Sequence, residues 1–268
     1  MKLCVAGGGK MAEALVGGLI AKGWAGASDI GVIEPSDQRR AALAATFDGL
    51  HLIGSCAEAS IAGFEVSNVL VAVKPQHVGE VARDLGPQGV ERVLSIAAGV
   101  RIAALADGFG HETRVVRAMP NTPALVGQGA AGIAASANAQ PDDIDWAIGI
   151  LSSVGTVAVV DEADLDAVTG LSGSGPAYVF LLAEAMIAAG IEQGLAPDVA
   201  NDLGRQTLLG AATLLSASDE DPAQLRANVT SPGGTTAAAI AQMQAGGLEA
   251  IIAAGIAAAT ARSIELGE

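Results

Sequence analysis

The chain has 268 residues, which is enough for one large domain or two modest ones. Its 29 acidic and 14 basic side chains give a formal net charge of −15, which disfavours nucleic acid as a partner because a phosphate backbone would be repelled. Hydrophobic residues make up 51% of the chain and aromatic residues only 3%, so we expect a core of small aliphatic side chains.

Short apolar runs alternate with helix-like stretches over the first hundred residues, which predicts a parallel, doubly wound α/β sheet. The predicted strands are Lys2–Ala6, Ile30–Ile33, Val69–Val73 and Val93–Ile96. The predicted helices are Met11–Lys22 and about Asp37–Phe47. Further strands would extend the sheet at Val115–Met119, Gly129–Ala134 and Thr156–Val160.

The pattern changes near Asp164, where strand-like runs give way to long Ala-, Leu- and Gly-rich segments with a helical period. Helix starts are expected at Gly175-Pro176, at Pro197-Asp198 before Val199–Leu215, and at Ser231–Gly234 before Thr235–Gln244. We therefore predict two domains: an α/β domain over residues 1–163 and an all-helical domain over residues 164–268, joined by a hinge near residues 161–167.

The mean hydropathy of the chain is high, so its longest apolar runs were considered as membrane spans. Ala118–Gln140 contains two prolines and several polar residues, and Ala250–Ala261 is too short, so a buried or interface helix is the better interpretation of the latter. The amino terminus, Met1–Ala6, leads into glycines without the apolar core of a signal peptide. We expect a soluble, cytoplasmic protein with no membrane partner.

Cysteine and histidine give no sign of a metal site. Cys4 and Cys56 lack metal-ligand spacing and are expected to be buried thiols. His51, His77 and His111 are far apart in the sequence, and none has a ligand-spaced partner. No metal is predicted.

The clearest local motif is Gly7-Gly8-Gly9-Lys10-Met11-Ala12, which fits G-x-G-x-x-A between a strand and a helix. In such a loop Gly7 allows the tight turn and Gly9 lets a pyrophosphate approach the backbone, while Ala12 keeps the helix close to the sheet. The N–H groups of the helix start would then face the anion. The motif predicts dinucleotide binding, although a glycine-rich turn without a ligand remains an alternative.

Residues after the second strand give two signals about the ribose. Glu34 lies where an acidic residue accepts the ribose hydroxyls of NAD, whereas Ser36, Arg39 and Arg40 could bind the 2′-phosphate of NADP. Glu34 could also be a solvated strand end, and the arginines could be an ordinary helix face.

Two later strand ends place small residues at the same carboxyl edge of the sheet, Ala72-Val73-Lys74-Pro75-Gln76 and Ser95-Ile96-Ala97-Ala98-Gly99. Such residues leave room for a ribose and a nicotinamide, because ligands bind at this edge in doubly wound sheets. Lys74 could equally be an exposed residue that ends the strand.

A second candidate segment is Asn228-Val229-Thr230-Ser231-Pro232-Gly233-Gly234-Thr235-Thr236, in the predicted helical domain. The backbone N–H groups of Gly234, Thr235 and Thr236 would point together at a carboxylate, and the Thr236 hydroxyl could hydrogen-bond a neighbouring nitrogen. A capped helix start without a ligand is an equally good interpretation of these residues alone.

Five motifs, in the same order along almost the whole chain, resemble those of the pyrroline-5-carboxylate reductase family. They are Gly7–Ala12, Ala72–Gln76, Met119-Pro120-Asn121-Thr122-Pro123, Gly170–Tyr178 and Asn228–Thr236. The resemblance implies a Rossmann domain followed by a helical dimerisation domain, with larger assemblies such as a pentamer of dimers as an option. It also implies reduction of 1-pyrroline-5-carboxylate to L-proline, the last step of proline synthesis, with NADPH or alternatively NADH.

The resemblance also assigns residues to the site. The implied cofactor contacts are Gly7, Gly8, Gly9, Lys10, Met11, Lys74, Pro75, Ala97, Ala98 and Asn228, to which the strand ends add Glu34, Ser36, Ala72 and Val73. The implied substrate contacts are Ser231, Gly234, Thr235 and Thr236.

The predicted chemistry is hydride addition to a cyclic C=N bond beside a carboxylate. The helix start at Gly233–Thr236 would hold the carboxylate, and Thr236 is the candidate catalytic residue that orients or protonates the imine nitrogen. A hydroxyacid dehydrogenase normally needs a Lys or His acid-base group in its helical domain, and this sequence has no Lys after Lys74 and no His after His111. A dinucleotide-binding sensor without turnover is the other alternative, and would tolerate damage at Ser231–Thr236.

Overall fold

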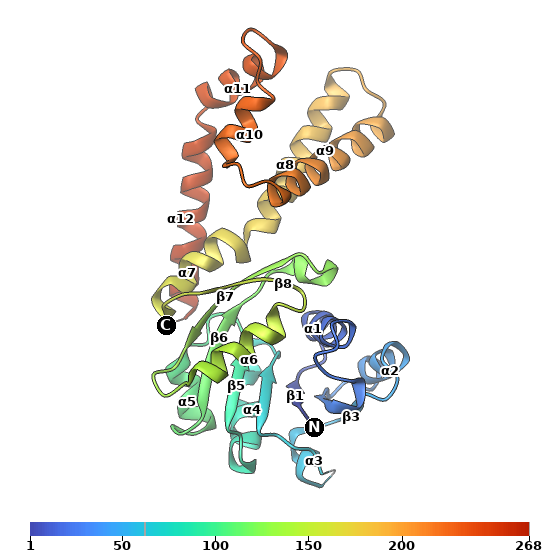
Figure 1. The fold of residues 1–268 in the computed structure, drawn as a ribbon, viewed down its shortest axis with the longest axis vertical. Coiled ribbons are helices and arrows are strands. Elements are labelled where there is room, and N and C mark those ends of the chain that lie inside the picture. The colour runs from blue at the N-terminus through green and yellow to red at the C-terminus, as the bar shows by residue number, and fades with distance from the viewer. Residues whose placement is uncertain (62, 268) are drawn as a thin grey trace. The chain divides into compact units, whose positions relative to one another are not determined.

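The structure of the protein is a computed structural model that describes residues 1–61 and 63–267. Its eight-stranded sheet has the order β3-β2-β1-β4-β5-β6-β7-β8. Figure 1 shows these strands in one layer. Their bounds are β1 Leu3–Ala6, β2 Ile30–Ile33, β3 His51–Ile53, β4 Asn68–Val71, β5 Arg92–Ser95, β6 Arg114–Met119, β7 Gly129–Ala135 and β8 Gly155–Val159.

The first six strands are parallel, and their order is that of the Rossmann fold. β1 and β2 are buried along their whole length because helices cover both faces of the sheet, and this is why they appear in the sequence as unbroken apolar runs. The predicted doubly wound fold is confirmed. The carboxyl edge between β1 and β4, where the strand order reverses, is the expected ligand position in this fold.

Two core clusters lie on the two faces of the sheet. Leu3 and Val5 of β1 belong to one cluster and Cys4 and Ala6 to the other, as the alternation of side chains along a strand requires. The first cluster includes residues of α1 Lys10–Ala21, α2 Asp37–Thr46 and α6 Pro141–Leu151. The second includes residues of α3 Cys56–Ile61, α4 Val78–Leu85 and α5 Ile102–Phe109.

The last two strands depart from the predicted parallel sheet. β7 runs antiparallel to β6, and β8 is parallel to β7. The connection from β6 to β7 contains only the 3-10 helix η4, Thr122–Val126, whereas a parallel return needs a longer crossover. The strands predicted over this region are all present, but the direction of β7 was not predicted.

Residues 175–257 form a compact unit of their own, while residues 1–174 and the residues from Ala258 on form the other. The unit of residues 175–257 contains α8 Gly175–Glu192, α9 Pro197–Ala217, α10 Pro222–Asn228, α11 Thr235–Ala245 and the first part of α12 Leu248–Leu266. Helix α7, Leu165–Val168, and the end of α12 belong to the other unit. The three predicted helix starts are confirmed. The predicted division into residues 1–163 and 164–268 stays a prediction.

Large apolar side chains are exposed on the helices of residues 175–257. They include Phe180 and Leu181 of α8, Leu209 of α9 and Ile251 of α12, each more than 60% exposed. By length and composition the helical stretch Glu162–Glu192 could cross a membrane, as could the bent pair α11 and α12 taken together. The stretch Glu162–Glu192 was not among the runs considered as spans from the sequence, whereas Ala250–Ala261 of α12 was considered and judged too short.

Candidate active site

The loop between β1 and α1 is held close to the ends of two neighbouring strands. Gly7 has a φ of +101°, and a Cβ atom on it would lie 2.8 Å from the carbonyl oxygen of Ala72 at the end of β4. The Gly7 N–H donates to the Ile33 carbonyl at 2.8 Å. Only glycine combines this backbone conformation with this close approach, so the predicted role of Gly7 in the tight turn is confirmed.

Open space lies beside the next glycine of the same loop. Gly9 is the N-cap residue of α1 with an extended backbone, and a Cβ on it would meet nothing within 4 Å. Ala12, one turn into the helix, is buried against the sheet. A glycine that no packing requires, at the start of a helix whose first N–H groups have no intrahelical acceptor, fits the close approach of a dinucleotide pyrophosphate.

A pocket of about 640 Å³ opens at the carboxyl ends of β1 to β4. It brings together six of the predicted cofactor residues: Gly7, Gly9, Glu34, Ala72, Val73 and Lys74. The pocket lining does not include the predicted residues Gly8, Lys10, Met11, Ser36, Pro75, Ala97, Ala98 and Asn228, all of which the structure describes. Gly8 is attached to it indirectly, through a hydrogen bond from its N–H to Glu34.

The pocket also contains residues that were not assigned to the site from the sequence. Gly54, Ser55 and Cys56 follow β3, a strand of three residues that begins with an exposed histidine and therefore lacks the apolar run of its neighbours. Its only sequence signal is Leu52-Ile53 followed by glycine. Burial raises the pKa of Cys56 to about 11, with further increases from Asp84 and Glu80, so this thiol stays protonated at neutral pH.

Charged side chains surround the end of β2. The Glu34 carboxylate accepts one hydrogen bond from the Gly8 N–H and one from the Ser36 N–H, both at 2.9 Å. Ser36 is the N-cap of α2, and its hydroxyl accepts from the Arg39 N–H at 3.3 Å. The Ser36 side chain therefore stabilises the helix start, and Glu34 is the side chain of this group that lines the pocket.

The loop after β5 is fixed from two sides. Ala97 is buried, and its N–H donates to the Ser95 hydroxyl at 3.3 Å. Gly99 has a φ of +78°, and a Cβ on it would lie 3.1 Å from the Leu266 carbonyl oxygen at the end of α12. The carboxyl end of α12 thus lies against the loop that contains the predicted cofactor residues Ala97 and Ala98.

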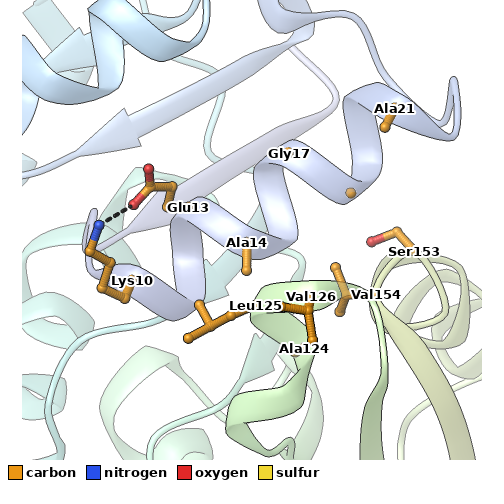
Figure 2. A pocket seen from close by; sticks show the side chains of 12 residues that line it. Lys10, Glu13, Ala14, Gly17, Ala21, Ala124, Leu125, Val126, Ser153 and Val154 are labelled. Carbon is orange, nitrogen blue, oxygen red and sulfur yellow. Dashed lines mark hydrogen bonds and ion pairs between the residues drawn. The ribbon is translucent and has the colours of Figure 1, made fainter. Parts of the chain in front are cut away.

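A second hollow, of about 680 Å³, runs along the outer side of α1 (Figure 2). Lys10 and Glu13 lie at one end of it, and Leu125 and Val126 of η4 lie beside the helix. The Lys10 ammonium is 3.2 Å from the Glu13 carboxylate. A hydrogen bond from Arg39 lowers the pKa of Glu13, and Lys10 adds to this effect. Lys10 therefore lines this hollow, although the resemblance assigned it to the cofactor.

The predicted substrate residues lie on the other unit, where α10 ends and α11 begins. Gly233 has a φ of +70°, and Gly234 is the N-cap of α11, with its N–H donating to the Ser231 carbonyl at 3.0 Å. Thr235 and Thr236 are the first two residues of the helix. The helix begins where it was predicted, but the Gly234 N–H is used within the turn, which leaves the N–H groups of Thr235 and Thr236 for an anion.

Asn228 closes α10 on the same unit. Its amide donates to Glu220 at 2.9 Å and its oxygen accepts from Gln224 at 2.7 Å. These bonds fix the amide in one orientation and say nothing of a cofactor contact, so its assigned role stays a prediction.

The strand order, the glycine loop and the acidic residue after β2 together define a Rossmann dinucleotide-binding domain, as found in NAD(P)-dependent oxidoreductases. Residues 2–99 match the family model described as NADP oxidoreductase, coenzyme F420-dependent. Residues 162–266 match the model for pyrroline-5-carboxylate reductase dimerisation.

Full-length relatives and structures narrow this class to one family. The pyrroline-5-carboxylate reductase of Pseudomonas aeruginosa is 44% identical over 100% of this chain and 97% of its own, and that of Synechocystis is 43% identical over 100% and 99%. The solved structure of the Coxiella burnetii reductase has a TM-score of 0.92 at 35% identity, covering 100% of this chain and 98% of that one. The Plasmodium falciparum enzyme, solved with NADP bound, gives 0.84 at 30% identity, with coverage of 100% and 98%.

The chain therefore belongs to the pyrroline-5-carboxylate reductase family. Its predicted identity as an NAD(P)H-dependent oxidoreductase is confirmed. The match of residues 162–266 supports a homo-oligomer of at least two copies, and the exposed apolar side chains of α8, α9 and α12 fall within it.

Proposed function

We propose that the protein reduces the C=N bond of 1-pyrroline-5-carboxylate to give L-proline, the last step of proline synthesis. The observation that carries this proposal is the glycine loop at the start of α1, with its open approach at Gly9, in a chain matched along its whole length by pyrroline-5-carboxylate reductases. Bound NAD(P)H supplies the hydride.

The dinucleotide is held by the carboxyl edge of the first unit. The N–H groups at the start of α1 bind the pyrophosphate beside Gly9, and Glu34 lies at the ribose side of the same pocket. Ala72, Val73 and Lys74 border the pocket at the end of β4. From the family resemblance, Lys10, Met11, Pro75, Ala97, Ala98 and Asn228 are further proposed contacts.

The substrate carboxylate is held at the start of α11. The N–H groups of Thr235 and Thr236 and the Ser231 hydroxyl are the proposed donors, since a helix start concentrates unpaired N–H groups and a partial positive charge. Gly234, whose own N–H donates to the Ser231 carbonyl, is proposed to border the carboxylate. This clamp fixes the ring, so that the reacting carbon is presented in one orientation and the entropic part of the barrier is reduced.

Thr236 is the proposed catalytic residue. Its hydroxyl hydrogen-bonds the ring nitrogen and holds the proton there, because the protonated C=N bond is the more electrophilic form. When hydride adds to the ring carbon, the π electrons of the C=N bond become the nitrogen lone pair of the amine. Positioning by the clamp and this hydroxyl replaces the Lys or His acid of hydroxyacid dehydrogenases.

The finer features of assembly and location are also proposals. We infer domains at residues 1–163 and 164–268, a dimer formed through the helical domain, a pentamer of such dimers, and a soluble cytoplasmic enzyme. The dimerisation match and the exposed apolar residues of α8 and α9 support an assembly of this kind.

Replacement of Thr236 tests the catalytic assignment. Thr236→Ala should lower turnover about 10²-fold or more while cofactor affinity changes less than threefold, because general acid–base assistance contributes about 10²–10⁴-fold. Thr236→Ser should retain much of the rate. Thr213→Ala on α9 is the matched control, since this exposed hydroxyl donates to the Leu209 carbonyl of its own helix.

The assay follows loss of reduced nicotinamide absorbance after the imine is added, and it separates the alternatives. Turnover with the imine supports the reductase. Binding of cofactor without turnover would favour the sensor, and turnover only with a hydroxyacid would favour the other dehydrogenase class. An unchanged rate for Thr236→Ala would reject the role given to that hydroxyl.

A further inference from the structure

The acidic residue after β2 is fixed in place by the backbone around it. Each oxygen of the half-buried Glu34 carboxylate accepts one N–H hydrogen bond, from Gly8 and from Ser36. A carboxylate oxygen has two acceptor positions, so each keeps one for a further donor. The side chain therefore presents two ordered acceptors to the pocket, which suits the two neighbouring hydroxyl groups of an adenosine ribose.

The arginine that follows on α2 is committed to partners of its own. The Arg39 Nε donates to the Gly8 carbonyl, and its Nη2 donates to the Glu13 carboxylate at 2.6 Å. This guanidinium thus joins α2 to the glycine loop and to α1, with its charge compensated by Glu13.

The neighbouring arginine is equally engaged. The Arg40 Nη1 donates to the carbonyls of Glu34 and Pro35, at 2.6 and 2.9 Å, and its Nη2 pairs with Asp37. Neither Arg39 nor Arg40 is among the described residues that line the pocket. The two cations that could have bound a 2′-phosphate are therefore used to build the loop instead.

The charges that do line the pocket are mainly negative. Glu34, Glu80 and Asp84 contribute carboxylates, Lys74 contributes an ammonium, and His77 lies 4.0 Å from Glu80. The extra phosphate of NADPH carries a charge of about −1.5 to −2 at neutral pH. Placed beside Glu34 it would be repelled, and repulsion between like charges is strong where water is partly excluded.

We propose that Glu34 makes this protein select NADH over NADPH, by accepting the ribose hydroxyls and repelling a 2′-phosphate. The inference rests on the proposed dinucleotide site. It adds a specificity-determining residue to it.

Cofactor binding without substrate tests the proposal directly. The dissociation constants of NADH and NADPH are measured by titration calorimetry with the intact protein, Glu34→Ser and Glu34→Gln. We expect NADH to bind at least tenfold more tightly than NADPH to the intact protein. Glu34→Ser, which removes the carboxylate and frees the Gly8 and Ser36 N–H groups, should lower this ratio at least tenfold, and Glu34→Gln should lower it less.

Glu91→Gln is the matched control, since Glu91 precedes β5 at the opposite edge of the sheet and pairs with Arg114 at 3.4 Å. It changes the net charge equally and should leave the ratio as it was. Raising the salt concentration with the intact protein gives a measurement that needs no variant. Screening should move the NADH to NADPH ratio toward one.

Equal or tighter binding of NADPH by the intact protein would overturn the proposal, as would a ratio that Glu34→Ser leaves unchanged. Because no imine is present, this outcome is independent of the reaction. Selective NADH binding without imine turnover would leave the inference standing while rejecting the proposed function.

Discussion

Replacement of Gly9 by alanine should separate cofactor binding from folding. The Gly9 backbone has φ −65° and ψ 179°, which any residue adopts, and an added methyl group would meet nothing within 4 Å. Alanine is a poorer N-cap than glycine by about 0.5–1 kcal/mol, while the less flexible unfolded chain offsets about 0.4–1 kcal/mol. The free energy of unfolding should therefore change by less than about 1 kcal/mol.

The same methyl group would occupy the space through which a pyrophosphate approaches the start of α1. Loss of one hydrogen bond to a charged group costs about 1.5–3 kcal/mol, which corresponds to about 10–100-fold weaker cofactor binding. Gly7→Ala should behave in the opposite way. Its methyl group would meet the Ala72 carbonyl at 2.8 Å and its φ of +101° is unfavourable, so we expect about 2–5 kcal/mol of destabilisation.

The assay pairs urea unfolding with a fluorescence titration of NADH for both variants. If Gly9→Ala were as stable as the parent and bound the cofactor equally well, the pyrophosphate would not lie at this loop. The account of the pocket would then be wrong. A strongly destabilised Gly9→Ala would contradict the open space seen beside it.

Three further predictions concern stability and assembly. Asp166→Ala should lower the free energy of unfolding by about 1–3 kcal/mol, because it removes the acceptor of the buried Ser263 hydroxyl, which lies 2.7 Å from the Asp166 carboxylate. Asp166→Asn keeps an acceptor oxygen and should lose less stability. Equal losses for the two variants in urea unfolding would contradict this prediction. Burial raises the pKa of Cys4 from 9.0 to about 12 and that of Cys56 from 9.0 to about 11. The unfolded chain therefore loses these protons at a lower pH than the folded protein, so the free energy of unfolding should fall as the pH rises above about 9. The urea midpoint of a Cys4→Ala, Cys56→Ala double variant should fall less steeply over the same pH range. Leu181→Glu places a charge on an exposed apolar face of α8 and should shift the mass measured by light scattering from an oligomer to a monomer, whereas an unchanged mass would place this face outside the interface.

Strands with unbroken apolar runs could be predicted from the sequence to within one or two residues. Ile30–Ile33 matches β2, and the strand predicted at Val69–Val73 is observed at Asn68–Val71. β3 was missed because three residues with an exposed histidine have no such run. Helix α12 extends beyond the predicted Ala250–Ala261 to Leu248–Leu266, since the charged residues Glu249 and Arg262 that bound the apolar run are good helix formers and do not end a helix.

The direction of β7 and the composition of the pocket depend on contacts between distant parts of the chain. The glycine loop was predictable because its spacing encodes a local turn, and Gly7 and Gly9 both line the pocket. Ser55 and Glu80 reach the same pocket from segments without a motif. The partners of Arg39 could not be predicted either, since its bonds to Gly8 and Glu13 depend on how α2 packs beside α1.

The most direct test of the central claim is a tracer measurement of the reaction. The protein is mixed with 1-pyrroline-5-carboxylate and reduced cofactor deuterated on the transferred face of the nicotinamide, and the product is analysed by mass spectrometry and NMR. We predict one L-proline for each cofactor oxidised, with a single deuterium on the ring carbon that was part of the C=N bond. Cofactor oxidation without labelled proline, or no oxidation with either NADH or NADPH, would contradict the assignment.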